Sequence, residues 1–264
     1  MNKLLRHLRI YKILVKLSFI REMAFRANFF IWFAVFAVDF AIYYFFYNSI
    51  YNNIDLIADW SKYEWLFYLG YEHIILAIFT GMFMDVVGLP NSINRGNLDY
   101  ILLKPIDSQF LASLGCFRLG YLSNAIPGII LMIYCIPEID FSISLLSISA
   151  AIIYTLVGLS ILFSILLIIS IIAIWIKRAS FVSPLFVQLT DFMRMPKSIF
   201  GKVTGAIFTY ILPILLVCSA PVGILISKPN TTTLVITLAV GIFWFTLSRM
   251  LWKFSLKHYE GASS

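Results

Sequence analysis

Five ionisable side chains interrupt apolar segments of this sequence, and they are the residues best placed to do chemistry inside a hydrocarbon environment. They are Asp39, Glu72, Asp85, Arg118 and Asp191. Each costs a few kcal/mol if it stays unpaired at the centre of a bilayer. Such residues form either a proton relay, a path for a charged substrate, or ion pairs within a helix bundle. We favour ion pairing, in which Arg118 neutralises Asp85 or Glu72, because a proton-coupled carrier usually holds more acidic groups at the midplane.

The motifs that accompany nucleotide hydrolysis and metal catalysis are missing from the sequence. Gly201-Lys202-Val203 comes nearest to a phosphate-binding loop, but it lacks the earlier glycine and the Ser/Thr that holds Mg²⁺. No HExxH, CxxC or GxSxG pattern occurs, and the three histidines are far apart. We therefore expect no catalytic residue, no metal site and no cofactor bound by this chain, which is not predicted to be an enzyme.

A polar segment at 88–109 separates two of the apolar runs. Its proline and glycine residues are flanked by charges of both signs, and its candidate contact residues are Pro90, Arg95, Asn97, Asp99, Tyr100 and Lys104. Arg95 and Asp99 are four residues apart, so they can pair on one helix face or reach charges on a partner. A membrane protein that keeps such an element between two spans usually presents it to a soluble protein.

The composition requires a membrane protein. Of the 264 residues, 61% are hydrophobic and 12% are charged, against about 25% charged in an ordinary soluble domain. The net charge of +7 does not indicate nucleic-acid binding, because the basic residues gather beside apolar spans as the positive-inside rule requires. The three cysteines are widely spaced in apolar segments and are expected to be core residues.

Several apolar runs exceed the ~20 residues that cross a bilayer as a helix. We predict an all-α polytopic fold in which residues 1–264 form a single transmembrane domain. Its six spans are expected at 28–50, 65–87, 110–135, 142–176, 180–193 and 231–254. The segment 88–109 would contain a short cytoplasmic coupling helix.

The first 26 residues are predicted to form an amphipathic interfacial helix. Leu4, Leu8, Tyr11, Val15 and Phe19 fall on one helical stripe, and the basic residues mostly avoid that stripe. A helix of this kind lies in the headgroup region of the anionic cytoplasmic leaflet, so membrane lipid is an expected partner.

The segment 195–229 allows two interpretations. It contains Met195-Pro196 and an apolar stretch that is broken by Pro213 and Pro221. One interpretation is a re-entrant hairpin on the outer side, and the other is an additional complete span. Interrupted backbone is tolerated at membrane depth only where protein or a cavity covers it. We favour the hairpin.

The distribution of basic residues gives the orientation. With six spans, 14 of the Lys and Arg residues lie on the side of the termini and of the polar segment. The opposite side would hold Lys62, Arg194, Lys197, Lys202 and Lys228. The bias places both termini in the cytoplasm of a multi-pass plasma-membrane protein.

The polar segment also carries a family resemblance. Residues 94–107 read NRGNLDYILLKPID, and the chain ends at 259–264 with YEGASS. Both resemble the small six-span permeases of the bacterial ABC-2 type, as does the stretch from Met195-Pro196 to Pro221. The departure is that this stretch is usually rich in Phe-Pro, whereas here it reads Met-Pro.

The resemblance implies a transporter in the bacterial inner membrane that pairs this chain with a second permease subunit, homologous or identical, and with a cytoplasmic ATPase dimer. ATP and Mg²⁺ would bind to the ATPase. Export of drugs, antibiotics or lipids is implied, by alternating access between the permeases, with the coupling helix seated on the ATPase. The alternative is a secondary, ion-coupled carrier or another membrane protein that needs no ATPase.

Overall fold

The computed structural model describes residues 3–24, 26–115, 117–142, 144–176 and 178–257. Helices make up nearly all of this part, and its only strands are the antiparallel two-residue pair β1 (Leu56–Ile57) and β2 (Trp60–Ser61). The all-α fold expected from the composition is therefore confirmed. The terminal segment 259–264, which contributes to the family resemblance, lies outside the described residues.

The helices differ widely in length, and short 3₁₀ or π turns join several of them. In chain order the helices are α1 (Lys3–Ala24), α2 (Arg26–Tyr51), α3 (Lys62–Phe83), α4 (Leu89–Asn94), α5 (Asn97–Leu102), α6 (Ser108–Ser113), α7 (Leu119–Leu122), α8 (Ala125–Cys135), α9 (Leu145–Trp175), α10 (Val182–Asp191), α11 (Lys202–Ala206), α12 (Leu215–Leu225) and α13 (Thr231–Lys257). The 3₁₀ turns are Met84–Gly88, Ile136–Glu138, Phe192–Arg194 and Lys197–Ile199, and the π turn is Ile207–Ile211.

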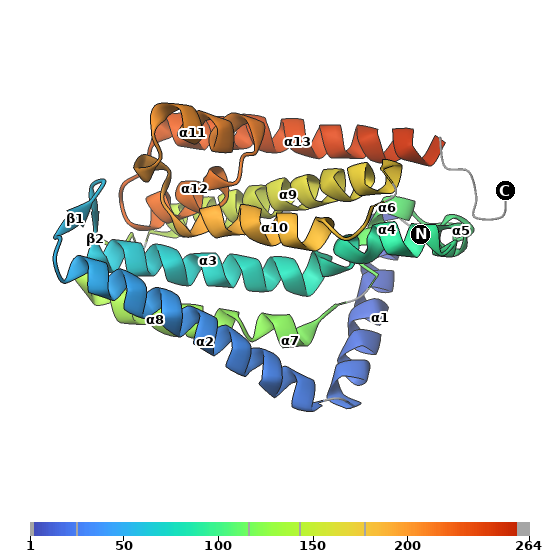
Figure 1. Cartoon of the computed structure of the whole chain (residues 1–264), viewed down its shortest axis with the longest axis horizontal. Helices are drawn as coiled ribbons and strands as arrows, with labels where there is room; N and C mark the ends of the chain where they lie inside the picture. Colours follow the sequence, from blue (N-terminus) through green and yellow to red (C-terminus); the bar gives the residue numbers. More distant parts are fainter. Residues whose placement is uncertain (1–2, 25, 116, 143, 177, 258–264) are drawn as a thin grey trace.

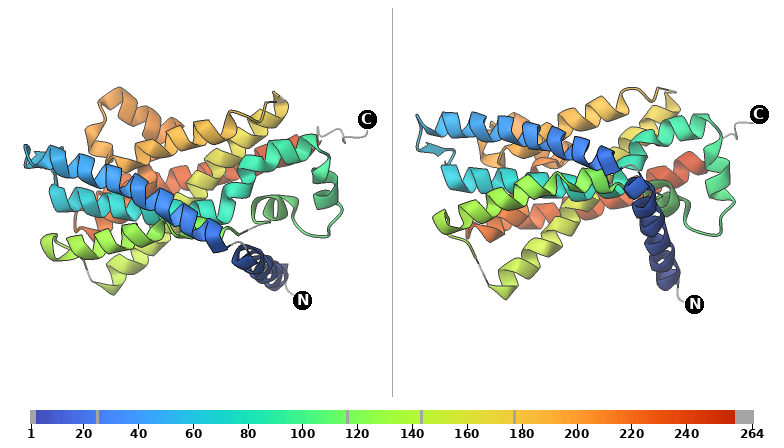
Figure 2. Two further views of the ribbon diagram at one scale, coloured as in Figure 1. Left: turned by 60° about the horizontal axis from the view of Figure 1, so that its bottom comes forward. Right: turned by 90° about the horizontal axis from the view of Figure 1, so that it is seen from below.

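The long helices form a bundle with two distinct ends (Figure 1). One end, here called the β end, carries β1 and β2. The opposite end, the α5 end, carries α4, α5, α6 and the last turns of α13. Helix α1 crosses the direction of the long helices near the α5 end (Figures 1 and 2). The first and last described helices therefore meet the polar segment at the same end of the bundle.

Within the described residues, five helices are long and apolar enough to cross a membrane. They are Ala27–Tyr51, Lys62–Ile93, Leu119–Glu138, Leu145–Trp175 and Thr231–Lys257, and the bent pair Lys202–Ile211 and Leu215–Leu225 raises the number to six. Helix α10 occupies the predicted span 180–193, but its 10 residues cover only about 15 Å of a hydrocarbon core that is about 30 Å thick. Helix α10 alone is therefore shorter than the hydrocarbon core, and the chain passes from the α5 end, where α9 finishes, to the β end, where Ser198 contacts Trp60, by means of α10 together with its flanking residues (Figure 1).

The segment 195–229 turns back on itself. Its two helical arms meet at an angle of 96°, and each arm is about 15 Å long. Near its start, Trp60 Nε1 donates a hydrogen bond to Ser198 Oγ over 3.0 Å, and near its finish Lys228 Nζ lies 2.7 Å from a Glu64 oxygen. Both ends of the segment thus contact residues 60–64 at the β end. The favoured interpretation of 195–229 as a re-entrant hairpin stays a prediction, because a bent pair of this kind is either a broken span or a re-entrant loop.

The predicted span 110–135 is not one helix. Helix α6 ends at Ser113, and the chain is extended at Arg118 before α7 begins. The backbone N–H groups around this break donate to other elements: Phe117 to Ser18 Oγ, Arg118 to the Gly81 carbonyl and Gly120 to Glu22 Oε2, over 3.0, 2.9 and 2.8 Å. The helix can stop inside the bundle because α1 and α3 supply these hydrogen-bond acceptors.

Helices α3 and α8 approach each other closely at two facing glycines. A Cβ atom added at Gly70 would lie 2.7 Å from the Gly128 carbonyl oxygen, and one added at Gly128 would lie 2.5 Å from the Gly70 oxygen. Only glycine lets two backbones approach this closely. The contact fixes α8 against the half of α3 that also carries Glu72 and His73.

Candidate functional site

The polar segment folds into two short helices joined by a sharp turn. Pro90 lies in the first turn of α4, where its missing N–H costs no hydrogen bond. Gly96, between α4 and α5, has φ of 75°, a left-handed conformation that favours glycine. We call residues 89–104 the elbow.

One face of the elbow is anchored and the other is open. Leu89, Ile93 and Leu98 are buried, whereas Tyr100 and Leu103 are 70% and 81% exposed. Of the predicted contact residues, Arg95, Asn97, Tyr100 and Lys104 are exposed, Asp99 is half-buried and Pro90 is buried. The elbow therefore presents an aromatic ring, an aliphatic side chain and basic groups beyond the bundle.

Arg95 and Asp99 do not pair with each other. Gly96 places them on different helices, and no ion pair joins them among the residues whose positions are described. The pairing suggested by their spacing of four residues is therefore wrong. Their charges remain open to a partner.

The elbow continues into α6, which is tied to the end of α13. Asp107 caps α6 by accepting a hydrogen bond from the Phe110 N–H over 3.0 Å. The same carboxylate accepts hydrogen bonds from both terminal nitrogens of Arg249. Gln109 Oε1 accepts a further hydrogen bond from Arg249 Nη1. Trp252 Nε1 donates to Ser108 Oγ over 3.2 Å. The hydrogen bonds from Arg249 are the main reason that the pKa of Asp107 lies below its ordinary value.

A second connection joins the elbow to the bundle interior. Buried Ser170 on α9 donates a hydrogen bond to the Val86 carbonyl, just before the elbow, over 3.0 Å. Arg118 Nη2 lies 2.9 Å from Asp85 Oδ1 in the same 3₁₀ turn. The two residues are 40% and 24% exposed as side chains, so this pair lies at the edge of the bundle.

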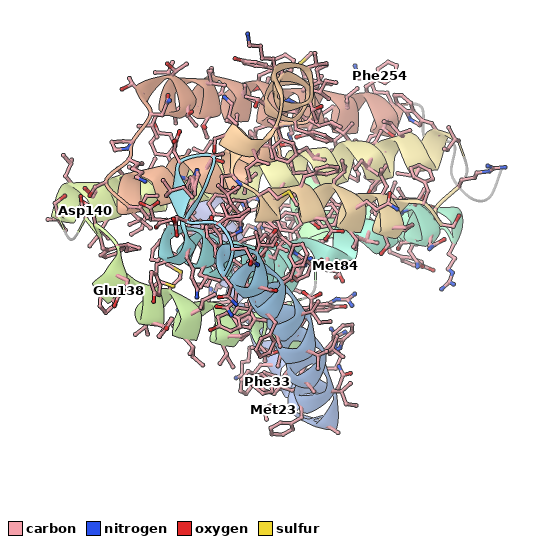
Figure 3. All side chains as sticks on the ribbon, turned by 60° about the vertical axis from the view of Figure 1, so that its left-hand side comes forward. Met23, Phe33, Met84, Glu138, Asp140 and Phe254 are labelled. Atoms are coloured by element: carbon pink, nitrogen blue, oxygen red, sulfur yellow. The ribbon has the colours of Figure 1, made fainter. Side chains whose placement is uncertain are left out.

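Helix α1 contacts the bundle through polar side chains near its C-terminal end and through the His7 ring. Ser18 and Glu22 accept the backbone hydrogen bonds described above, and the His7 ring meets the edge of Phe110 with 4.9 Å between centroids. Phe19 of the predicted stripe is 49% exposed. Met23 and Phe33 point away from the bundle at the corner between α1 and α2 (Figure 3).

The remaining intramembrane charges converge on Arg194, which follows α10. Its guanidinium lies 3.2 Å from Asp39 on α2, 3.2 Å from Asp191 on α10 and 3.6 Å from Glu72 on α3. It also lies over the Tyr43 ring, 3.8 Å from the centroid, a favourable cation–π geometry. One arginine therefore holds three helices together.

His73 completes this charge cluster, which we define as Asp39, Glu72, His73, Asp191 and Arg194. Its Nδ1 lies 2.8 Å from Glu72 Oε2 and 3.0 Å from the Leu69 carbonyl oxygen, and its Nε2 lies 3.9 Å from Asp39. Glu72 is fully buried and His73 is 1% exposed. Three carboxylates face one guanidinium, and His73 can carry a second positive charge. The cluster therefore places charges of both signs between α2, α3 and α10.

Comparison with known proteins identifies the family. A family model described as an ABC-2 family transporter protein matches residues 37–263, most of the chain. The chain belongs to the ABC-2 transporter family. No curated protein and no solved structure matches it significantly. The ABC-2 match begins within α2 and includes both the elbow and the charge cluster.

The structure separates the five predicted intramembrane charges of this ABC-2 chain into two groups. Asp39, Glu72 and Asp191 meet at Arg194, and Asp85 meets Arg118. Of the two partners considered for Arg118, Asp85 is the one in contact. Arg194, which the count of basic residues placed outside, lies against the middle turns of α2 and α3.

Sequence reasoning missed the partners of Arg194 and Arg249, which lie on other elements. Arg249 and Asp107 are 142 residues apart, and Arg194 and Asp39 are 155 apart. No local spacing predicts such contacts. A usable signal was the excess of carboxylates over basic residues within the apolar runs, which required a nearby cation.

Proposed function

We propose that this protein is the membrane-spanning permease subunit of an ABC transporter, driven by ATP hydrolysis on separate ATPase subunits. The observation that carries the proposal is the elbow, which holds Tyr100 and Leu103 70% and 81% exposed while Leu98 is 2% exposed. An anchored helix with an open apolar and basic face suits a docking contact. Membership of the ABC-2 family supports an ATPase as the partner.

The path of force from the elbow follows from its contacts. If an ATPase dimer displaces the elbow, α6 moves with it, and the Asp107–Arg249 pair pulls the end of α13. The Ser170–Val86 hydrogen bond carries the same displacement to α9. Helices α9 and α13 lie side by side along the bundle (Figure 1). A small cytoplasmic contact can therefore tilt two long helices.

The orientation belongs to the same proposal. The α5 end would face the cytoplasm of a bacterial inner membrane, with both termini on that side, because most basic residues lie there. Helix α1 crosses the long helices at this end, which suits an interfacial helix on an anionic leaflet. The β end and the hairpin 195–229 would face outward.

The cargo and the second permease are further parts of the proposal. The chain would export drug-like, amphipathic or lipid-like molecules together with a second permease, homologous or identical. The surface of α2 supports a partner within the membrane, because Phe30, Val38, Ile42 and Phe45 are each more than 60% exposed. Lipid or another permease must cover this surface.

The charge cluster favours one second candidate, a secondary carrier coupled to an ion. Buried Glu72 and His73 beside Asp39 are the kinds of groups that such carriers use. The two candidates differ in their energy source. Proteoliposomes that hold this chain with a candidate ABC ATPase, or this chain alone, should be tested for transport.

The ABC proposal expects transport only with the ATPase and ATP, and no ATP hydrolysis by the chain alone. A matched control uses an ATPase whose phosphate-binding lysine is changed. Transport by the chain alone under an ion gradient would replace the ABC proposal with the carrier.

A further inference from the structure

A groove of about 670 Å³ lies between α3, α6, α9 and α13. Its residues on α9 run from Ile152 to Phe163, which corresponds to about 16 Å along the helix axis. This length is about half of a hydrocarbon core that is about 30 Å thick. The groove therefore extends through one leaflet, from the level of Arg249 toward the middle of the bundle.

The lining of the groove is amphiphilic. Asp107, Gln109 and Arg249 lie at its α5 end, and most of the remaining wall is apolar. Ile152 and Leu156, which also line the groove, are 56% and 61% exposed. A ligand that fits this layout has a polar head at one end and a hydrocarbon chain behind it.

One polar group inside the groove lacks a partner. Ser113 lines the groove, is 2% exposed, and its hydroxyl makes no hydrogen bond within the described part of the chain. A buried hydroxyl without a hydrogen-bond partner destabilises the fold unless a ligand supplies that partner. An ester or phosphate oxygen could accept the hydrogen bond that Ser113 offers.

The charged residues at the α5 end of the groove indicate which kind of lipid head group it binds. Asp107 neutralises Arg249, so the site has no net charge. Hydrogen bonds to Asp107 and Gln109 use three of the five N–H donors of Arg249 and leave two. A phosphate can accept from these two donors while an ammonium group donates to Asp107. A purely anionic head would meet the Asp107 carboxylate without compensation.

We propose that this groove binds one phospholipid with a zwitterionic head of the phosphatidylethanolamine type, taken from the leaflet at the α5 end. The acyl chain lies against α9, and the head bridges Asp107 and Arg249. The bound lipid then contacts α6, α9 and α13 together, the helices that connect the elbow to the bundle. This proposal concerns binding to the chain itself and does not depend on any ATPase.

The test uses the purified full chain in nanodiscs that contain a photoactivatable phosphatidylethanolamine with its reactive group in the acyl chain. Cross-linked peptides are mapped by mass spectrometry. Leu156→Trp narrows the groove, and Ile153→Trp is the matched control, since Ile153 is 55% exposed on the same helix and does not line the groove. We expect labelling of residues 152–163 in the wild type and in Ile153→Trp, and a loss of about fivefold or more in Leu156→Trp.

A competition experiment needs no variant and so holds even if Leu156→Trp folds poorly. Excess unlabelled phosphatidylethanolamine should remove the wild-type labelling, whereas excess phosphatidylglycerol should not. Equal labelling of the two tryptophan variants, or equal competition by the anionic lipid, would overturn the proposal. Disulfide formation between copies through Leu156→Cys, together with no lipid labelling, would show that a second copy covers the groove.

Discussion

Arg249, near the end of α13, donates hydrogen bonds to the carboxylate of Asp107 from both of its terminal nitrogens, and Asp107 in turn caps α6. The two residues are 142 positions apart. The polar segment between the second and third spans is therefore no free loop. Its movement is linked to the last helix of the described chain.

Substitutions at Asp107 should separate its two roles. Asp107→Asn keeps an oxygen that can cap α6 but weakens the pair with Arg249, so we expect a loss of about 1 kcal/mol. Asp107→Ala also removes the cap and should cost about 1 kcal/mol more. Thermal unfolding of the purified chain in detergent measures both losses. Identical stability of Asp107→Asn and the wild type would show that the pair contributes nothing.

The same pair should give the stability a defined dependence on pH. The Arg249 hydrogen bonds hold the pKa of folded Asp107 below its ordinary value of 3.8. The pair therefore adds stability above that ordinary value, and this stability is lost as the pH falls through the lower folded pKa. The difference in melting temperature between the wild type and Asp107→Asn should be constant above about pH 5 and should shrink below about pH 4.

Asp55→Asn is the control for this titration, because Asp55 is exposed and forms no ion pair among the described residues. Asp55→Asn should have the same melting temperature as the wild type at every pH. A difference for Asp107→Asn that stays unchanged down to the lowest pH would contradict the assignment.

The two intramembrane arginines should differ in importance. Arg194→Leu leaves fully buried Glu72 and its neighbours without their cation, which should cost about 3–5 kcal/mol. Arg118→Leu removes a pair at the edge of the bundle and should cost about 1 kcal/mol. The yield of monodisperse protein and its melting temperature measure both effects. Equal losses would mean that the charge cluster does not hold the helices together.

Glu72→Gln tests the same cluster from the other side. In an Arg194→Leu background it removes the stranded charge, so the double variant should recover part of the lost stability. A double variant that is as unstable as the sum of the single variants would show that Glu72 and Arg194 act independently.

The contact between α3 and α8 should tolerate no side chain at its glycines. The methyl group added by Gly70→Ala or Gly128→Ala would collide with the backbone of the facing helix. We expect each substitution to lower the free energy of unfolding by about 1–3 kcal/mol. Gly88→Ala is the control, because nothing lies within 4 Å of a Cβ atom added there. Unchanged melting of Gly128→Ala would place the two helices farther apart than described.

The helical class, the elbow and the interruption at 195–229 could be predicted because they depend on local properties of the sequence. Apolar runs require helices in a bilayer, and Gly96 and Pro90 mark a turn and a helix start. The positions of α4 and α5 follow from these residues. Long-range contacts are of a different kind, since Arg194 and Arg249 find carboxylates more than 140 residues away.

The break before α7 could not be predicted from residues 110–135. This stretch is apolar enough to form a continuous helix, and the interruption exists because Ser18, Glu22 and Gly81 accept the freed N–H groups. The acceptors lie on α1 and α3, so only the tertiary structure shows that they are available.

The proposed orientation can be tested with single cysteines in a background that lacks the three native cysteines. Asn52 lies beyond α2 toward the β end and Asn97 lies in the elbow, and both are exposed. In intact cells a membrane-impermeant maleimide should label Asn52→Cys and not Asn97→Cys. Permeabilised cells should show labelling at both. Labelling of Asn97→Cys in intact cells would reverse the proposed topology.

Docking of an ATPase on the elbow tests the central claim most directly. The variant is Tyr100→Asp with Leu103→Asp, which places charges on the open face and leaves buried Leu98 and Ile93 in place. Leu145→Asp is the control, since Leu145 is 85% exposed and lies at the start of α9, far from the elbow. All three chains should melt alike.

The measurement is the amount of a co-expressed candidate ABC ATPase that co-purifies with each chain. The wild type and Leu145→Asp should retain the ATPase, and the elbow variant should lose about tenfold or more of it, as expected when central apolar anchors of an interface are removed. Full retention of the ATPase by a folded elbow variant would contradict the account.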